Sequence, residues 1–339
     1  MLRSLFTALL LLASTASLAA PAPLTVYTSR QAHMIEPILS LYSEQTGVAI
    51  QAVYVPRIGL EAMLQAEQEK GTGQGDLVLL NNVSRLTALV DLGLTQPINS
   101  PVMFGIPAQY RDPEHHWFGL TLRTRAIYTR KTEFGGVGAV ALRMEDLAKP
   151  EFQGKVCMRS GSSPFNTGMI AQMIAANGEA ATRQWLIDLK ANLVRQPQGT
   201  DKKQIIAVAE GVCDYAVANS YYFGYMDKDD TERELAKRVH INFANQQDRG
   251  AHMNLSGAVV LNSAPNPEGA QAFIEYLASD AAQALYPALN DEYPIRAALA
   301  ASELVASWGR FKPDSVMIAD WAGFEADAQR LVADTGFDD

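Results

Sequence analysis

The sequence predicts an α/β protein built from two lobes. Short β-rich segments alternate with amphipathic helical segments along most of the chain, which is the pattern of sheets covered by helices. With 339 residues, of which 48% are hydrophobic and 19% charged, the chain is globular and longer than a single core usually supports. One β-like segment, residues 118–128, is long enough to leave one lobe and enter another.

The first lobe is expected to begin with a βαβαβα unit. The apolar residues Ile35, Ile38, Leu39 and Tyr42 recur at the spacing that places them on one face of a helix. Ser84 is the expected N-cap of the last helix of the unit. The predicted elements are strands at 24–27, 49–54 and 76–80, and helices at 35–46, 59–69 and 84–92.

The second lobe is expected to open with a strand at 154–158. Asp201 is the predicted N-cap of one of its helices, and Asn266 followed by Pro267 begins a later helix that ends near Ala278. The tail from Ser302 is mostly helical. The remaining predicted elements of this lobe are helices at 164–177, 178–191 and 201–210 and a strand at 214–218. Strands at 241–243 and 252–261 could carry the chain back to the first lobe, to which the helix after Asn266 belongs.

The chain is expected to cross between the lobes more than once. We assign residues 24–121 and 250–290 to the first lobe, and residues 122–249 and 291–339 to the second. Two α/β lobes joined by strands form a hinge with a cleft, and such a hinge can close around a ligand.

The N-terminus has the pattern of a secretory signal peptide, residues 1–19. Arg3 supplies a positive charge, and the apolar segment 5–13 is too short to span a membrane. We place cleavage after Ala19, or less favourably after Ala20, because Pro21 would be poor directly after the cut. The alternative is a buried N-terminal helix. The mature chain is expected to be exported and not embedded in a membrane.

The net charge of the chain argues against a nucleic-acid partner. The chain has 28 basic and 37 acidic residues and a net charge of −9, without a basic stripe interleaved with aromatic residues, so nucleic acid is not an expected partner.

Cys157 and Cys213 each begin an apolar strand-like segment. In an exported chain they form a disulfide if the strands are neighbours, and are otherwise two buried thiols.

No motif assembles an enzyme active site. The sequence lacks a Gly-x-Ser-x-Gly elbow, a Walker loop, His-Glu-x-x-His and Cys-x-x-Cys. We therefore expect a protein that is not an enzyme. A secreted hydrolase that uses the cleft is the alternative from a different class.

Two adjacent tyrosines, Tyr221 and Tyr222, directly follow the predicted strand at 214–218. In an open α/β sheet, ligands bind beyond the carboxyl ends of the strands, so this is a favourable place for a site. A Tyr-Tyr pair alone is more often core material, because each ring buries a large area and its hydroxyl finds one partner. Whether the pair forms a binding site or packs in the core depends on the neighbouring sequence.

Four dispersed segments carry a family resemblance: Pro197–Asp201, Ala218–Gly224, Asn245–Gly257 and Glu292–Pro294. They resemble the periplasmic ferric-iron-binding proteins, the transferrin-like receptors of bacterial iron ABC transporters, and the resemblance extends over residues 24–337. It implies the type II two-lobe periplasmic binding protein fold. It also implies a monomer in the periplasm that delivers Fe³⁺ to an inner-membrane ABC permease and its ATPase.

The resemblance further implies that Tyr221 and Tyr222 supply two phenolate ligands. Fe³⁺ is a small, hard cation that favours charged oxygen donors, and a bound cation displaces the phenolic proton. Two phenolates leave one positive charge of Fe³⁺ uncompensated and coordination positions open, so further donors or an anion are needed.

The chain departs from the family pattern at the other ligand positions. Gln31 and Ala32 stand where a His-Tyr pair is usual, with His33 one place later. Phe165 replaces a further tyrosine, and Asn81 stands where another branch of the family has a glutamate. The rest of the ligand set is therefore open.

Three completions of the site remain. A synergistic anion such as carbonate could fill the open positions. His33 or Gln31 could have moved into the ligand role. The site could instead take an iron chelate or another small anion. For Arg123 and Arg125, the alternative is that their charged side chains face solvent. The residues expected to hold an anion or to surround the metal are Arg125, Arg123, Ser162, Ser163, Ser220, Gln31, Asn81 and Asn82.

Overall fold

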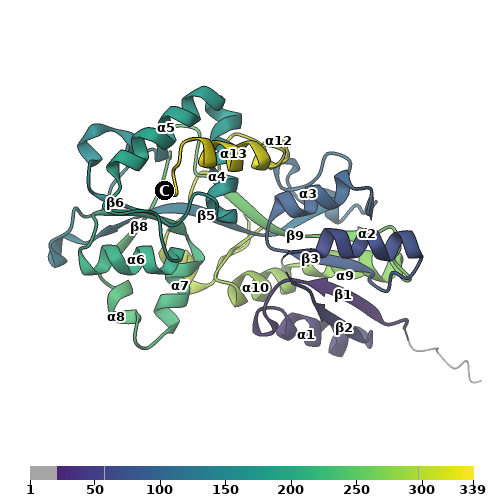
Figure 1. Ribbon diagram of the computed structural model, residues 1–339. Helices are drawn as coiled ribbons and strands as arrows, with labels where there is room; N and C mark the ends of the chain where they lie inside the picture. The colour runs from purple at the N-terminus through teal and green to yellow at the C-terminus, as the bar shows by residue number, and fades with distance from the viewer. Residues whose placement is uncertain (1–20, 57, 297) are drawn as a thin grey trace, which may run out of the picture.

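The computed structural model describes residues 21–56, 58–296 and 298–339, so the predicted signal peptide lies outside the described residues. Two lobes lie side by side along the long axis of the molecule, and strand β5 (Trp117–Arg130) runs from one into the other (Figure 1). The predicted two-lobe α/β architecture is confirmed.

Strands and helices alternate through most of the chain. The strands are β1 (Leu24–Thr28), β2 (Ile50–Tyr54), β3 (Leu77–Leu80), β4 (Thr95–Gln96), β5 (Trp117–Arg130), β6 (Val156–Cys157), β7 (Tyr215–Asn219), β8 (Val239–Phe243), β9 (Met253–Leu261) and β10 (Tyr293–Pro294). The α-helices are α1 (Glu36–Thr46), α2 (Leu60–Lys70), α3 (Val83–Asp91), α4 (Pro164–Asn177), α5 (Glu179–Asn192), α6 (Asp201–Glu210), α7 (Tyr221–Lys228), α8 (Arg233–Ala236), α9 (Pro267–Leu277), α10 (Asp280–Leu289), α11 (Glu303–Ser307), α12 (Ile318–Ala322) and α13 (Glu325–Asp334). The 3-10 helices are η1 (Ala32–Met34), η2 (Met103–Gly105), η3 (Ala108–Tyr110), η4 (Thr132–Phe134), η5 (Met144–Ala148) and η6 (Pro150–Phe152).

The sheet of the first lobe has the strand order β2-β1-β3-β9-β5. Strand β1 pairs in parallel with β2 and β3, and β9 pairs antiparallel with β3 and β5. Helices pack on this sheet, with α1 against β2, α3 and α9 against β9, and α10 against β5. Strand β3 is an unbroken apolar segment because it is buried along its whole length.

The second sheet begins where β5 changes partners. Residues 117–124 of β5 pair with β9, whereas residues from Arg125 onward pair with β7 and β8. Strand β6 adds to β7 in parallel. Strand β5 therefore belongs to both sheets and connects the lobes, and the exact lobe boundaries given above remain a prediction.

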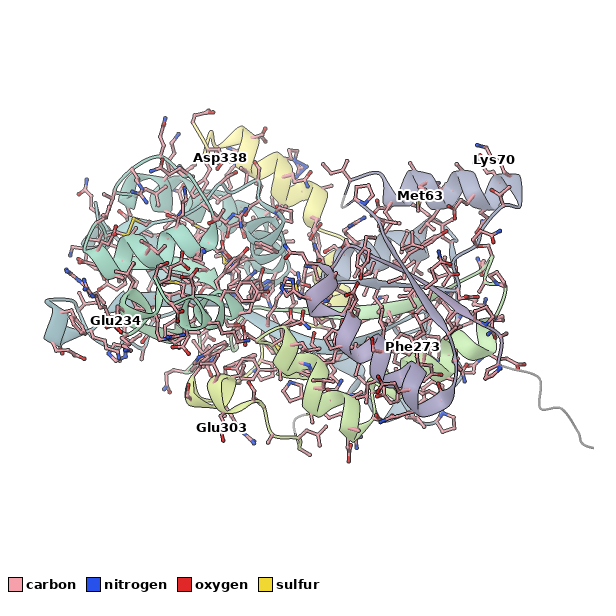
Figure 2. The ribbon with its side chains drawn as sticks, turned by 90° about the horizontal axis from the view of Figure 1, so that it is seen from below. Met63, Lys70, Glu234, Phe273, Glu303 and Asp338 are labelled. Carbon is pink, nitrogen blue, oxygen red and sulfur yellow. A yellow bond between two sulfur atoms is a disulfide. The ribbon has the colours of Figure 1, made fainter. Side chains whose placement is uncertain are left out.

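One large hydrophobic core extends through both lobes, and a smaller cluster that includes Cys157 and Val208 lies in the second lobe. Figure 2 places Met63, Lys70 and Phe273 on the first lobe and Glu234 and Asp338 on the second. The C-terminal helices α12 and α13 pack on α4 in the second lobe, and α12 also contacts α3 of the first. Among the described residues, no helix combines the length and apolar character needed to cross a bilayer.

Two predicted helix caps are wrong. The N-cap of α3 is Asn82, whose side chain accepts a hydrogen bond from the backbone N–H of Ser84 at 3.2 Å. The N-cap of α6 is Thr200, because Asp201 is already helical and its carboxylate is buried against Arg125. The predicted cap at Asn266 is confirmed, since its side chain accepts from the N–H of Gly269 at 3.0 Å.

The two cysteines form a disulfide. Cys157 lies at the end of β6, Cys213 precedes β7, and their Cα atoms are 5.9 Å apart. Of the two alternatives that the sequence left open, the structure contains the disulfide, because β6 and β7 are neighbours in the sheet.

Removing this disulfide is expected to lower the free energy of unfolding by about 2–4 kcal/mol, because the bond closes a long loop and restricts the unfolded chain. The measurement is urea unfolding of the wild type and of a Cys157→Ala/Cys213→Ala variant. Wild type unfolded in the presence of reductant should have the midpoint of the variant. Equal midpoints for oxidised wild type and variant would contradict the expectation.

Candidate functional site

The tyrosine pair lies at the junction of a strand and a helix. Strand β7 ends at Asn219, and α7 begins at Tyr221, so both tyrosines occupy the first turn of the helix. Their ring centroids are 4.5 Å apart, and the Asn219 side-chain N–H donates to the Tyr221 hydroxyl at 3.3 Å. Phe165 of α4 meets both rings edge-on, with centroids 6.4 Å away.

A third tyrosine, Tyr225, lies one turn further along α7. Residues four apart share a face of a helix, and the Tyr225 ring centroid is 5.3 Å from that of Tyr221 and 5.7 Å from that of Tyr222. Tyr225 is not among the site residues predicted from the sequence. The i, i+4 spacing of Tyr221 and Tyr225 was the available signal, but it has meaning only once a helix is assigned there.

The tyrosines face a small cavity between the lobes, with a volume of about 190 Å³. One wall comes from α7 of the second lobe, and the opposite wall comes from the loops after β1 and β3 of the first. The lining residues are Ser29, Arg30, Gln31, Met34, Asn81, Tyr221, Tyr222, Tyr225 and Glu292.

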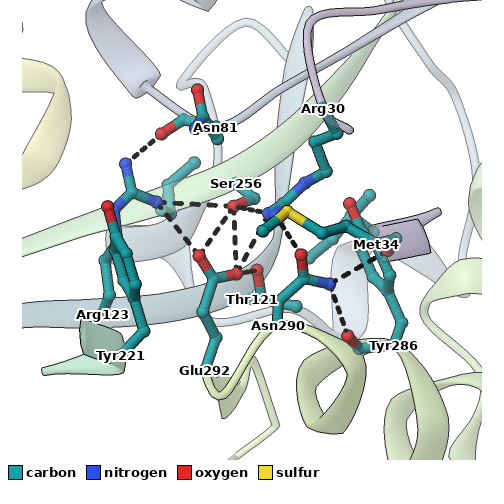
Figure 3. A network of polar contacts seen from close by, with 12 residues as sticks. Arg30, Met34, Asn81, Thr121, Arg123, Tyr221, Ser256, Tyr286, Asn290 and Glu292 are labelled. Carbon is teal, nitrogen blue, oxygen red and sulfur yellow. Dashed lines mark hydrogen bonds and ion pairs between the residues drawn. The ribbon is translucent and has the colours of Figure 1, made fainter. Parts of the chain in front are cut away.

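A buried charge network, formed by Arg30, Arg123, Glu292, Ser256 and Thr121, lies beside this cavity (Figure 3). One oxygen of Glu292 is 3.1 Å from Arg30 Nη2, and the other is 3.7 Å from Arg123 Nη1. The hydroxyls of Ser256, at 3.2 Å, and of Thr121 also donate to Glu292. The Glu292 carboxylate is thus shared by two guanidinium groups, and the network has one excess positive charge.

This positive charge lies close to the first tyrosine. Figure 3 shows the Tyr221 ring beside the Arg123 side chain, whose guanidinium also donates to the backbone carbonyl of Asn81. Arg123 is only 1% exposed, and burial lowers its pKa, although Glu292 and Tyr221 oppose the shift.

Burial controls the protonation of the phenols. It raises the pKa of Tyr221 well above 10, with Tyr222 adding to the shift and Arg123 opposing it. Burial also raises the pKa of Tyr225, and the Glu292 carboxylate raises it further. Both phenols are therefore neutral at pH 7 without a ligand, and a bound cation is needed to displace their protons.

Only some of the predicted site residues meet at the cavity. Tyr221, Tyr222, Gln31 and Asn81 line it, and Arg123 lies directly behind it. His33 belongs to η1 and is exposed, and its side chain is not part of the lining. The structure therefore brings Gln31, but not His33, to the tyrosines.

Arg125 has a different role from the predicted one. It is 1% exposed, and its guanidinium pairs with Asp201 and donates to the Asn166 side chain and to the Val217 carbonyl, the latter at 3.2 Å. These partners occupy the group that was expected to hold an anion. The alternative that Arg123 and Arg125 face solvent is wrong, because the crossing strand is buried on both sides.

Four of the residues that were expected to surround the metal make hydrogen bonds elsewhere, either within the second lobe or as helix caps. Ser162 donates to the Asp338 carboxylate at 2.7 Å, and Ser163 is the N-cap of α4. The Ser220 hydroxyl accepts from the Thr124 N–H at 3.4 Å, and Asn82 caps α3. The structure therefore does not bring Ser162, Ser163, Ser220 or Asn82 into the lining of the cavity.

Other donors suited to a metal do not cluster. Within the described part of the chain, no group of three or more His, Cys, Asp and Glu side chains is placed to hold a metal ion. Side chains that carry oxygen gather instead at the cavity, whose lining includes three tyrosines, Gln31 and Asn81.

The two-lobe fold with a polar cleft between its lobes defines a solute-binding protein. A family model described as bacterial extracellular solute-binding protein matches residues 76–313, and the chain belongs to this family.

Individual relatives are similar over nearly the whole chain. Iron uptake protein A1 of Synechocystis is 33% identical over 318 residues, which covers 93% of this chain and 87% of that protein. The Mannheimia haemolytica ferric iron-binding protein A, solved in an open conformation, is 40% identical with a TM-score of 0.87, covering 94% of this chain and all of that one. A Trichodesmium protein solved with iron and citrate is 31% identical with a TM-score of 0.87 and the same coverage.

Replacing Glu292 by Gln is expected to destabilise the protein by about 3 kcal/mol, because Arg30 and Arg123 would lose their shared buried counter-charge. The measurement is the free energy of unfolding in urea. Glu303→Gln, at an exposed position, is the matched control and should change stability by less than about 0.5 kcal/mol. A Glu292→Gln protein as stable as the control would show that the network does not support the fold.

Proposed function

We propose that this protein captures ferric iron in the cleft between its lobes and delivers it to an inner-membrane ABC permease and its ATPase. The observation that carries the proposal is the convergence of Tyr221 and Tyr222 on a cavity lined by both lobes. The proposal is supported by the relatives, which are named as iron uptake and ferric iron-binding proteins.

The chemistry of the cavity suits Fe³⁺. Phenolates are hard, anionic oxygen donors, and Fe³⁺ is charged enough to displace protons from phenols of raised pKa. Since Gln31 and Asn81 belong to the first lobe and the tyrosines to the second, affinity would depend on how far the lobes close.

A synergistic anion remains part of the proposal. Carbonate or another small anion would complete the coordination of iron, and the side chains that could contact it from the first lobe are Ser29, Gln31 and Asn81. Arg123 would act on it through its positive charge from behind the lining.

The chain is a solute-binding protein and not an enzyme, as its family indicates, so the hydrolase alternative is dropped. The family is extracellular and supplies solutes to transporters. Location in the periplasm after cleavage behind Ala19, and a monomeric state, are part of our proposal.

Capture of an iron chelate is the second candidate function, because the Trichodesmium relative was solved with iron and citrate together. The two candidates differ in whether iron binds without its chelator. Titration with ferric nitrilotriacetate should load the protein equally well if Fe³⁺ alone is the cargo. Loading from ferric citrate only, with labelled citrate retained, would favour the chelate.

Ferric citrate is expected to colour the purified wild type, because tyrosinate-to-Fe³⁺ charge transfer absorbs visible light. The visible band should disappear in Tyr221→Phe/Tyr222→Phe, which lacks both oxygens. Tyr215→Phe is the matched control, since Tyr215 packs on Phe152 with ring centroids 5.0 Å apart and lies outside the cavity lining. A wild type that stays colourless and retains no iron would refute the proposed function.

A further inference from the structure

We infer that Tyr225 is a third phenolate ligand, so that α7 alone supplies three anionic oxygens to Fe³⁺. The inference rests on the proposed function and extends its ligand set beyond Tyr221 and Tyr222. It is carried by the position of Tyr225 in the cavity, by the partner of its hydroxyl and by the charge of the surroundings.

Tyr225 lies beside the other two tyrosines. Tyr225 lines the same 190 Å³ cavity as Tyr221 and Tyr222, and its ring is within 6 Å of both, centroid to centroid. A rigid helix holds the three rings, because the i, i+4 spacing puts Tyr225 above Tyr221 on one face. Three donors fixed on one short element are oriented before the metal arrives, which reduces the entropy cost of binding.

The Tyr225 hydroxyl makes only a weak hydrogen bond. In the described part of the chain its one hydrogen-bond partner is Met34 Sδ at 4.0 Å, and a thioether is a weak acceptor. Two buried tyrosines donate to oxygen instead: Tyr293 to the Gly309 carbonyl at 3.0 Å, and Tyr128 to two carbonyls at 3.3 Å. Buried Tyr110, like Tyr225, contacts a thioether, that of Met253 at 3.9 Å. The Tyr225 hydroxyl can therefore turn to a cation without breaking a strong bond.

The charge of Fe³⁺ also favours a third phenolate ligand. Two phenolates leave Fe³⁺ with one uncompensated positive charge, next to a network whose two arginines already exceed its one carboxylate. Glu292 lines the cavity, but its oxygens are engaged by Arg30 and Arg123. Phe165 packs on the tyrosine rings and has no oxygen to offer. A third phenolate from Tyr225 makes the iron and its phenolates neutral together.

Tyr225 also touches the opposite lobe. Its partner Met34 belongs to η1 in the first lobe, whereas α7 belongs to the second. The third donor thus lies where the walls of the cavity meet, and iron bound there is in contact with both.

The test compares wild type, Tyr225→Phe and the control Tyr215→Phe during titration with ferric citrate. Tyr225→Phe should still form a coloured complex through Tyr221 and Tyr222, with the band weaker by about one third because three phenolates become two. It should also release its iron at a lower citrate concentration. A coloured wild type whose spectrum and citrate midpoint are unchanged in Tyr225→Phe would overturn this inference and leave the proposed function standing.

A second measurement needs no variant. Ultraviolet difference absorption counts the phenols that lose their protons when the wild type binds iron. Three per iron are expected, and two would overturn the role of Tyr225. A wild type that shows no visible band and retains no iron would instead refute the proposed function itself, so the two failures are distinguishable.

Discussion

The interaction on which the rest of the structure depends is the sharing of the Glu292 carboxylate by Arg30 and Arg123. All three side chains are almost fully buried, and buried charges are tolerated only when they are paired and hydrogen-bonded. Arg30 follows β1, Arg123 lies on β5, and Ser256, which also binds the carboxylate, lies on β9. The network therefore holds the loop after β1 against the strand that connects the lobes, and with it one wall of the cavity.

The opposite wall is held by the same short segment of chain. Gly224 of α7 approaches Asp291 so closely that a Cβ atom at this position would lie 2.5 Å from the Asp291 carboxyl carbon. The Asp291 carboxylate also accepts a hydrogen bond from Lys228, the last residue of α7, at 2.6 Å. Residues 290–292 thus contact the Arg30 network on one side and the tyrosine helix on the other. Both walls of the candidate site are built on one support.

The candidate site was predicted from the sequence in part. The tyrosine pair directly follows a predicted strand, where sites concentrate. Gln31 and Asn81, which line the cavity with it, were found because the family resemblance places metal ligands at their positions. Arg123 and Arg125 looked alike in sequence, yet one pairs with Glu292 and the other with Asp201. Their partners lie far away in the chain, so spacing alone could not separate a residue beside the cleft from one in the core of the second lobe.

The sequence by itself determined the two-lobe α/β architecture, the crossing strand and the position of the tyrosine pair. These features depend on local periodicity and on the order of segments, which are properties of the chain read in one dimension. Only the tertiary structure decided that Cys157 and Cys213 pair, that Thr200 and not Asp201 caps α6, and that Tyr225 shares the cavity. Each of these depends on which segments become neighbours after folding. Packing and the pairing of buried charges determine which segments become neighbours. The residue pattern of a single segment carries no information about its partners.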